Sequence, residues 1–518
     1  MIGLSFEAYT RDPADPVHYR NTVSGALGIR LFGANGKPVE DVLFEGNRLR
    51  FYKNNSINGA DADHNRLRFR RNVFADNYSR KGHGQGLFIG GARDILLEDN
   101  LFDHNGWLLR ADADADVGTA EGAATIFNHD TYFSTVDDTR FAGNSFHRPS
   151  SIGTKWTANE GERSSVGIEI RDNLYNDCEI GISAGGNIPG PYRFADMTVV
   201  GNVITDLGRS RQTDRALGWG IDMNDWDGGR CDSNLVIQVR NDTVGNAYGI
   251  SFRGGLRDVH VRANTVADLG RGYGLYFEGA TGERVRVGGN ALALDDDREA
   301  FFGGSGLPLD YHFDGNTYAA PTGSGDLRFR GGASYSLDEW LELSGERPAS
   351  LERPEFRDDT RSLDRYITEV LGLADRAAFY AALRTFSREH WDERYGARAI
   401  NDYLREGYSV TAAPLSLDGE GDTGGDLPPE AEASVALRIF PNPTTAEVTL
   451  ADARLGAWVF VHDAFGRRVR DEHLGRRPSK SAGPAAGLVR RHRPHRRELP
   501  RRAGALATVS PPGIVTAG

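Results

Sequence analysis

The sequence predicts an all-β solenoid of about ten coils, and three observations support this fold class. Glycine makes up 64 of 518 residues, about 12% against the ~7% of ordinary globular proteins, yet no Gly-X-Y period is present. A triplet of Asn, any residue and an apolar residue recurs along the chain, and a short alternating strand pattern recurs between the triplets. A turn-dense repeat architecture explains all three.

The Asn triplets set the length of one coil. Seven of the nine intervals between triplets are 22 to 29 residues long, which suits a coil of three short strands and three turns. Stacked coils place equal positions above one another, so we expect these side chains to form an amide ladder at a sharp corner. The triplets begin at Asn47, Asn72, Asn100, Asn144, Asn173, Asn202, Asp242, Asn264, Asn290 and Asn316.

The strand pattern between the triplets starts with Gly and an apolar residue, as at Gly86, Gly181, Gly220, Gly249 and Gly274. Alternate residues of such a strand point inward. Alignment of these strands predicts two outward rows of side chains on successive coils. One row holds Lys155, Ser183, Asp222, Ser251 and Tyr276, and the next holds Gly185, Asn224, Arg253 and Glu278.

Two intervals are longer, from Asn100 to Asn144 and from Asn202 to Asp242. A solenoid accommodates extra residues as surface loops, so we expect these two loops to wall a binding cleft. The first contains Trp107 and an alternating acidic run, Asp112, Asp114 and Asp116, which we interpret as a solvated loop. The second contains Trp219 and the segment 222–228.

Over about residues 20 to 320 this repeat resembles the right-handed parallel β-helix proteins of the pectate-lyase-like superfamily. The resemblance implies right-handed parallel coils over a first domain, residues 1–320. It also implies a protein that acts on polysaccharides, with side chains that project from one sheet. We therefore expect a polysaccharide as the partner of this chain.

The repeat stops after Tyr318, and helical periodicity follows. Ser336 and Glu339 have the spacing of a capping box that opens a short helix. We interpret residues 321–411 as a helical C-terminal cap, because an open solenoid end exposes core and unpaired backbone. Residues 412–434 are acidic and rich in Gly and Pro, which predicts a flexible linker.

Residues 435–475 contain Pro441-Asn-Pro-Thr444 followed by short strand patterns. They resemble the C-terminal sorting domain of Bacteroidetes type IX secretion, a small β-sandwich, of which only part is present. The resemblance implies export by the type IX secretion machinery to the cell surface or the medium. Such cargo carries a signal peptide, and the first residues lack its basic and apolar regions. We expect the true N-terminus to lie upstream.

Charge and composition exclude several classes of function. The whole chain carries −12 and residues 476–518 carry +9, so the first 475 residues carry −21. A body this acidic repels phosphate backbones, and we expect no nucleic-acid partner. The abrupt change to an Arg- and Pro-rich composition predicts that 476–518 is disordered or out of frame. No apolar run is long enough to span a membrane, two cysteines cannot form a four-thiolate zinc site, and we expect a monomer.

The outward rows supply candidates for the chemistry of a polysaccharide lyase. A lyase needs a base for the proton beside a carboxylate, and a cation that neutralises that carboxylate. His129 or Lys155 is the candidate base, Arg253 the candidate cation, and Asp222 the fourth catalytic candidate. The residues expected to contact substrate are Asp130, Trp156, Asn224, Asp225, Trp226 and Glu278.

Two alternatives remain open at this point. A glycoside hydrolase would use two carboxylates roughly 5 to 9.5 Å apart, and Asp222 with Asp225 or Asp130 are the candidates. A non-catalytic glycan-binding or adhesion protein would need aromatic side chains but no acid–base pair. No cofactor is expected, although Asp222, Asp225 and Asp227 have the composition of a calcium loop.

Overall fold

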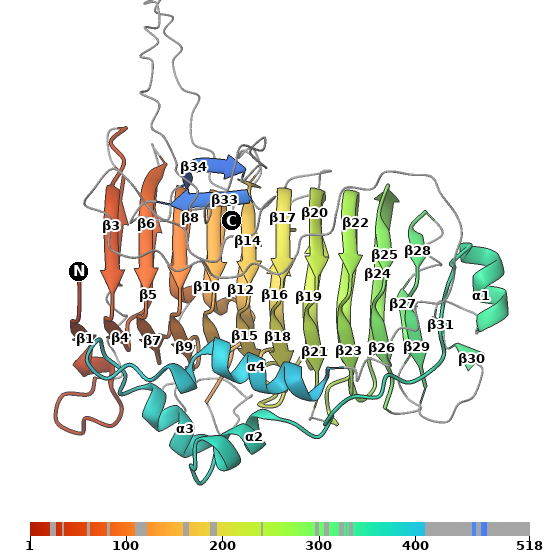
Figure 1. Ribbon diagram of the computed structural model, residues 1–518. Coiled ribbons are helices and arrows are strands. Elements are labelled where there is room, and N and C mark those ends of the chain that lie inside the picture. The colour runs from red at the N-terminus through yellow and green to blue at the C-terminus, as the bar shows by residue number, and fades with distance from the viewer. Residues whose placement is uncertain are drawn as a thin grey trace, which may run out of the picture. The chain divides into compact units, whose positions relative to one another are not determined.

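The computed structural model describes residues 1–20, 27–33, 36–59, 63–79, 83–108, 122–158, 165–186, 194–239, 242–295, 300–304, 310–320, 326–327, 329–330, 335–409, 458–462 and 468–473. The chain divides into two compact units, Met1–Leu415 and Ser416–Gly518. The first unit is a right-handed parallel β-helix, as Figure 1 shows, and the predicted fold class is confirmed. The linker 412–434, the Pro441–Thr444 turn and the tail 476–518 lie outside the described residues.

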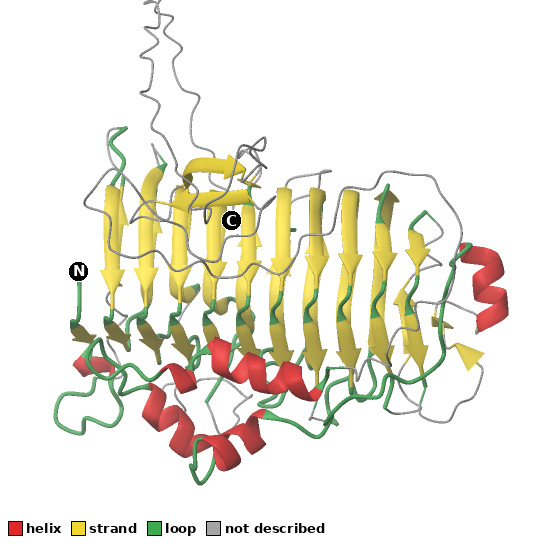
Figure 2. Cartoon of the chain, viewed as in Figure 1, coloured by secondary structure: helices red, strands yellow, loops and turns green. Residues whose placement is uncertain are grey.

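One face of the solenoid, here called the short-strand sheet, has eleven parallel strands of three residues. Each successive coil adds one strand, which Figure 2 shows as a row of arrows side by side. The strands are β1 (Ser5–Glu7), β4 (Arg48–Arg50), β7 (Val73–Ala75), β9 (Leu101–Asp103), β11 (Ser145–His147), β15 (Leu174–Asn176), β18 (Val203–Thr205), β21 (Leu235–Ile237), β23 (Thr265–Ala267), β26 (Ala291–Ala293) and β29 (Thr317–Ala319).

The remaining coil strands form two further walls. The first wall contains β2 (Leu27–Phe32), β5 (Asn54–Asn58), β12 (Ile152–Thr157), β16 (Ile180–Ala184), β19 (Leu217–Asn224), β24 (Tyr273–Glu283), β27 (Ala300–Gly304) and β31 (Phe329–Arg330). The second contains β3 (Glu40–Glu45), β6 (His64–Arg70), β13 (Ser165–Val166), β14 (Ile168–Arg171), β17 (Phe194–Val200), β20 (Trp226–Asp232), β25 (Arg286–Gly288) and β28 (His312–Asp314). The long strands β8 (Gly84–Glu98), β10 (Asn128–Ala142) and β22 (Asn246–Arg262) run through both walls, and the end of β24 also reaches the second wall.

The predicted asparagine ladder is present inside the coils. Each Asn donates from its side-chain nitrogen to the side-chain oxygen of the Asn one coil further on, at 2.9 to 3.0 Å. The same oxygen also accepts from the preceding Asn backbone N–H, so one side chain pairs two buried donors at each corner. The members are Asn47, Asn72, Asn100, Asn144, Asn173, Asn202, Asn234, Asn264, Asn290 and Asn316.

One member of the predicted series was wrong. The ladder passes from Asn202 to Asn234 and on to Asn264, and Asp242 is an exposed turn residue. Asn234 begins the triplet Asn-Leu-Val, which has the same pattern as its neighbours, and β21 follows it directly. The coil is therefore not abnormally long at its Asn corner. The extra residues instead lie before and after β21, at 206–216 and 238–245.

The ladder ends on a carboxylate. Glu346 accepts from the backbone and side-chain nitrogens of Asn316 at 2.9 and 2.8 Å, and from Tyr318 and Trp340 at 2.8 Å. Trp340 belongs to α1 (Leu337–Ser344), whose predicted capping box at Ser336 and Glu339 is present. The Trp340 ring packs on Phe302 and Phe313 of the last coils. The helix α1 therefore covers core at the C-terminal end of the solenoid.

The rest of the helical segment lies elsewhere. The helical strap, residues 362–408, comprises α2 (Leu363–Arg365), η3 (Tyr366–Val370), α3 (Arg376–Leu383), η4 (Glu393–Tyr395) and α4 (Ala397–Gly407). Its apolar side chains form one cluster with outward residues of the short-strand sheet, among them Val73, Leu101, Leu174 and Leu235. Figure 1 shows these helices along that sheet. Of the segment predicted as one cap, 321–411, α1 lies on the last coil and the strap covers the sheet, because that sheet face is apolar.

The remaining elements are short. The first coil includes η1 (Tyr9–Arg11), β30 (Asp326–Leu327) pairs with β32 (Tyr335–Ser336), and the second unit contains the antiparallel hairpin of β33 (Trp458–His462) and β34 (Arg468–His473). Cys178 and Cys231 are buried and not bonded to each other. Among the described residues, no helix is long and apolar enough to cross a membrane.

Candidate functional site

The predicted outward rows exist on the first wall. Strand register places Lys155 beside Ser183, Ser183 beside Asp222, Asp222 beside Ser251, and Ser251 beside Tyr276. We call this set the Lys155 row. In the next outward row, Asn224 pairs with Arg253 and Arg253 with Glu278. Neighbouring members are one strand apart, about 4.8 Å.

His129 lies beside the Lys155 row on β10. Its coil position is continued by Ile152, Ile180, Trp219 and Tyr248, and Ile152 and Ile180 form a small cluster separate from the main core. The imidazole stacks on Tyr132, the register partner of Lys155, with 5.8 Å between ring centroids. His129 and Lys155 therefore lie on adjacent coils, three residues apart in register, and the charge of Lys155 acts on His129.

The electrostatics of this site favour the uncharged forms of both bases. Burial, together with the positive charges of Lys155 and Arg215, holds the pKa of His129 well below its ordinary value. Burial also lowers the pKa of Lys155; the Asp222 carboxylate opposes that shift and Arg215 adds to it. The Nδ1 atom of His129 has no hydrogen-bond partner among the described residues. A neutral imidazole is able to accept a proton, and this Nδ1 atom is buried.

Asp222 is buried within its row, with 6% of its surface exposed. Ser251 donates its hydroxyl to Asp222 at 2.6 Å. Burial raises the pKa of Asp222, although Arg253, the Ser251 hydroxyl and Lys155 act in the opposite direction. Asp222 is consequently a carboxyl group that takes up a proton more readily than an exposed aspartate.

Arg253 joins the two rows. Its guanidinium lies 3.3 Å from Asp222 and 2.7 Å from Glu278, and it lies over the Trp219 ring, 4.3 Å from the centroid. The cation predicted to neutralise a substrate carboxylate is thus already paired with two carboxylates. Glu278 is the more exposed of these two partners.

Aromatic rings extend this site toward the C-terminal coils. Tyr248 stacks on Trp219 at 5.0 Å and on Tyr276 at 3.9 Å between centroids. Rings stacked along the solenoid axis cover one another's faces, and Tyr248, between the other two, is buried. Trp219 is the one tryptophan of the inserted segments that is partly exposed at this site.

Three predicted contact residues are inside the coils, and these predictions were wrong. Trp156 and Trp226 are both 0% exposed in the main core: Trp156 stacks on Phe133 at 4.1 Å, and Trp226 donates to the Ala184 carbonyl at 2.9 Å. Alternation from outward Lys155 already places Trp156 inward. Asp130 occupies the position of Gly86 and Gly153 in adjacent coils, and its carboxylate accepts from Asn105 at 2.8 Å.

The acidic residues after Asp222 have separate structural partners. Asn224 packs against Gly185 and Gly186, Asp225 accepts from the Gly255 backbone at 3.0 Å in a left-handed turn, and Asp227 pairs with Arg257. Within the described ranges no group of three or more His, Cys, Asp or Glu side chains is arranged to hold a metal ion. Asp225 is a corner residue, so Asp222 and Asp225 are not neighbours in one row.

No pattern in the sequence points to Arg215 as a residue of this site. It lies in the loop 206–216, where it pairs with the buried carboxylate of Glu179 and donates to Ser151 at 2.8 Å. Its charge acts on both His129 and Lys155. Of the other predicted loop, Trp107 is buried and donates to the Arg148 carbonyl at 2.7 Å, while Asp112, Asp114 and Asp116 lie outside the described residues.

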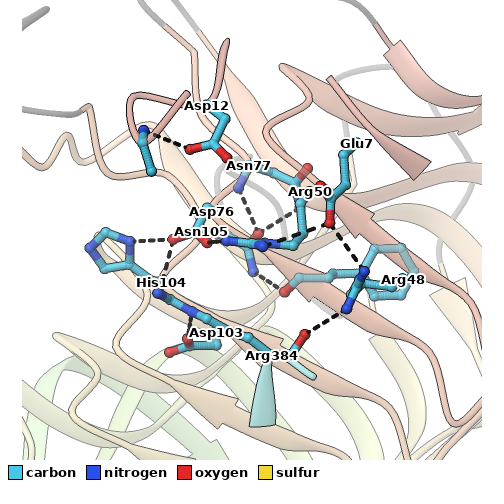
Figure 3. Close-up of polar contacts among 12 residues, drawn as sticks. Glu7, Asp12, Arg48, Arg50, Asp76, Asn77, Asp103, His104, Asn105 and Arg384 are labelled. Atoms are coloured by element: carbon cyan, nitrogen blue, oxygen red, sulfur yellow. Dashed lines mark hydrogen bonds and ion pairs between the residues drawn. The ribbon is translucent and has the colours of Figure 1, made fainter. Parts of the chain in front are cut away.

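A second group of titratable side chains lies between the short-strand sheet and the strap (Figure 3). His104 and Arg384 both contact Asp76, at 3.0 and 2.9 Å, and Arg384 also contacts Asp103 at 2.7 Å. Burial raises the pKa of Asp76, but His104, Arg384 and Arg50 outweigh it, so this pKa lies well below the ordinary value. These buried and mutually paired groups attach the strap and leave no reactive atom open to a ligand.

Comparison with known proteins adds little to this geometry. No family model matches the chain, and no curated protein matches it. One similar solved structure is the surface protein and adhesin PfbA of Streptococcus pneumoniae, at 9% identity and a TM-score of 0.30, covering 54% of this chain and 82% of that chain.

Proposed function

We propose that this chain is a carbohydrate-active β-helix protein that cleaves an acidic polysaccharide by β-elimination at the Lys155 row. The observation that carries the proposal is the pair His129 and Lys155, two bases held toward their uncharged forms beside the cations Arg215 and Arg253. Elimination needs a base for the proton next to a carboxylate and a positive charge on the developing enolate.

In this proposal the Lys155 amine or the His129 imidazole removes the proton. Arg253 binds the substrate carboxylate in place of Glu278 and offsets charge in the transition state. The raised pKa of Asp222 suits a group that gives a proton to the leaving oxygen. The tyrosine hydroxyls of the aromatic group would hydrogen-bond the neighbouring sugar residues.

A hydrolase is less well supported by the same geometry. It needs two carboxylates facing one bond, and the candidates Asp130 and Asp225 lie inside the coil and at a corner. Asp222 and Glu278 flank Arg253 and are the remaining pair, but both bind that one cation. A binding protein without catalysis would use the same face and no proton transfer.

The test is incubation with alginate, pectin, glycosaminoglycans and neutral glycans. A lyase produces unsaturated ends, read by ultraviolet absorbance, together with reducing ends. A hydrolase produces reducing ends alone, and a binding protein retains the polymer and produces neither. The proposal fails if no acidic polymer yields unsaturated ends.

We also propose that the protein reaches the cell surface or the medium by type IX secretion. Its support is the Pro441-Asn-Pro-Thr444 motif and the strand patterns of 435–475. Fusion of residues 435–518 to a reporter in a type IX secreting bacterium tests this, and retention of the reporter in the periplasm would contradict it.

A further inference from the structure

A row of basic side chains runs along the last coils on the second wall. Strand register places Arg230 beside His260, His260 beside Arg286, and Arg286 beside His312. All four side chains are exposed. They belong to β20, β22, β25 and β28, which Figure 1 shows side by side. We call this set the basic stripe, and it is on a different wall from the Lys155 row.

The basic stripe lacks the ion pairs that other arginines of this protein form. None of its four members has an ion pair or a side-chain hydrogen bond with a described residue. The acidic neighbours are already paired with other arginines: Asp232 with Arg262 at 3.1 Å, Asp258 with Arg284 at 2.6 Å, and Asp227 with Arg257. Asp314, beside His312, remains exposed.

In earlier coils, arginines at the same strand position do form ion pairs. Strand register continues the stripe backward from Arg230 to Thr198, then to Glu169, then to Arg140. Arg140 pairs with Glu169 at 3.8 Å. Arg68, further back, pairs with Asp94 at 2.6 Å. The stripe therefore holds two arginines without an ion pair to a described residue, Arg230 and Arg286, although Arg230 still acts on the Asp232 carboxylate. They lie on a body that carries −21 over its first 475 residues. Such a surface attracts an anion from outside the chain.

We propose that the basic stripe binds a linear acidic polysaccharide laid along the solenoid axis. Its members repeat at about 4.8 Å, so the guanidinium groups of Arg230 and Arg286 lie two strands apart, roughly 10 Å, with His260 between them. Arginine matches carboxylate and sulfate groups with two parallel hydrogen bonds. The acidic body disfavours nucleic acid. This inference does not rest on the proposed elimination, because the two sites are on different walls.

The test compares two double variants of the full chain. Arg230→Ser with Arg286→Ser removes the two arginines of the stripe, and Arg93→Ser with Arg140→Ser removes the same charge from the same wall. Titration calorimetry with alginate oligomers at low salt should show the stripe variant weakened roughly tenfold and the control less than about twofold. Both variants keep the basic segment 476–518, so their difference reports the stripe alone.

Equal affinities of the two variants would overturn the proposal, and so would a wild-type chain that binds no acidic oligomer. Binding of single-stranded DNA that is as tight and as sensitive to the stripe variant would assign the stripe to nucleic acid instead. Binding that persists in a chain with no elimination activity would remove the proposed function and leave the stripe standing. Replacement of His260 and His312 by Gln should weaken alginate binding as well, and no change would count against the role of these two positions.

Discussion

The guanidinium of Arg384 donates to the carboxylate of Asp103 at 2.7 Å, although 281 residues separate them in the sequence. Asp103 is buried in the short-strand sheet and also binds Arg148 at 2.8 Å. The strap is thereby attached by charge as well as by its apolar cluster (Figure 3). Since burying charges is costly unless they are paired, this attachment should be sensitive to single substitutions.

We therefore expect Arg384→Ala to lower the free energy of unfolding by about 3 kcal/mol, because it leaves the buried carboxylates of Asp103 and Asp76 with fewer partners. Urea denaturation measures the loss, and hydrogen exchange should rise first in residues 363–408. The control is Arg394→Ala, which breaks an exposed pair with Asp392 and should have little effect. Equal effects of the two variants would contradict this assignment.

The terminal carboxylate of the ladder gives a second prediction. Glu346→Ala leaves four buried donors of Asn316, Tyr318 and Trp340 without their acceptor. We expect a loss of about 3 kcal/mol or more in unfolding free energy. Glu342→Ala, an exposed change on the same helix, should leave thermal unfolding nearly unchanged, and a Glu346→Ala protein as stable as this control would rule out the proposed role.

A third prediction concerns the site. Lys155→Ala and His129→Ala should each be compared with Lys37→Ala. Lys37 is exposed and distant from both residues in the sequence. We expect replacement of the residue that acts as base to lower turnover on an acidic polymer by about 10²-fold or more. Lys155→Ala should change the free energy of unfolding by less than about 1 kcal/mol. If both variants kept full turnover, the chemistry would belong elsewhere.

Asp177 supplies a pH dependence. Burial raises the pKa of Asp177 to about 6, although Ser210 and Arg376 oppose the shift. The folded state then holds this proton more tightly than the unfolded state. Protonation of Asp177 therefore adds to the free energy of unfolding below about pH 4, and this stabilisation is lost as the pH rises to about 6. Over that window we expect the wild type to lose about 2 to 3 kcal/mol relative to Asp177→Asn. Parallel stability curves for the two proteins would contradict the assigned pKa.

Much of the fold was predictable because a solenoid repeats its contacts. Strand alternation and the Gly-apolar pattern aligned Lys155, Ser183 and Asp222, and the register agrees residue by residue. The Asn triplets predicted the ladder, except that Asp242 replaced Asn234. That error arose because Asn234 and Asp242 are each followed two positions later by an apolar residue. The sequence alone does not show which of them accepts the hydrogen bond from Asn202.

The sequence by itself determined the repeat, the ladder and the outward rows, because each depends on periodic positions within one coil. Only the tertiary structure decided what lies at the corners and beyond the repeat. Asp130 is buried and accepts from Asn105, and the left-handed Asp225 precedes the inward Trp226. Arg215 reaches the site from a loop, and the strap lies along the sheet because that face is apolar and carries buried carboxylates. Such contacts join residues that are not separated by whole numbers of coils, so the repeat does not predict them and only the folded chain shows them.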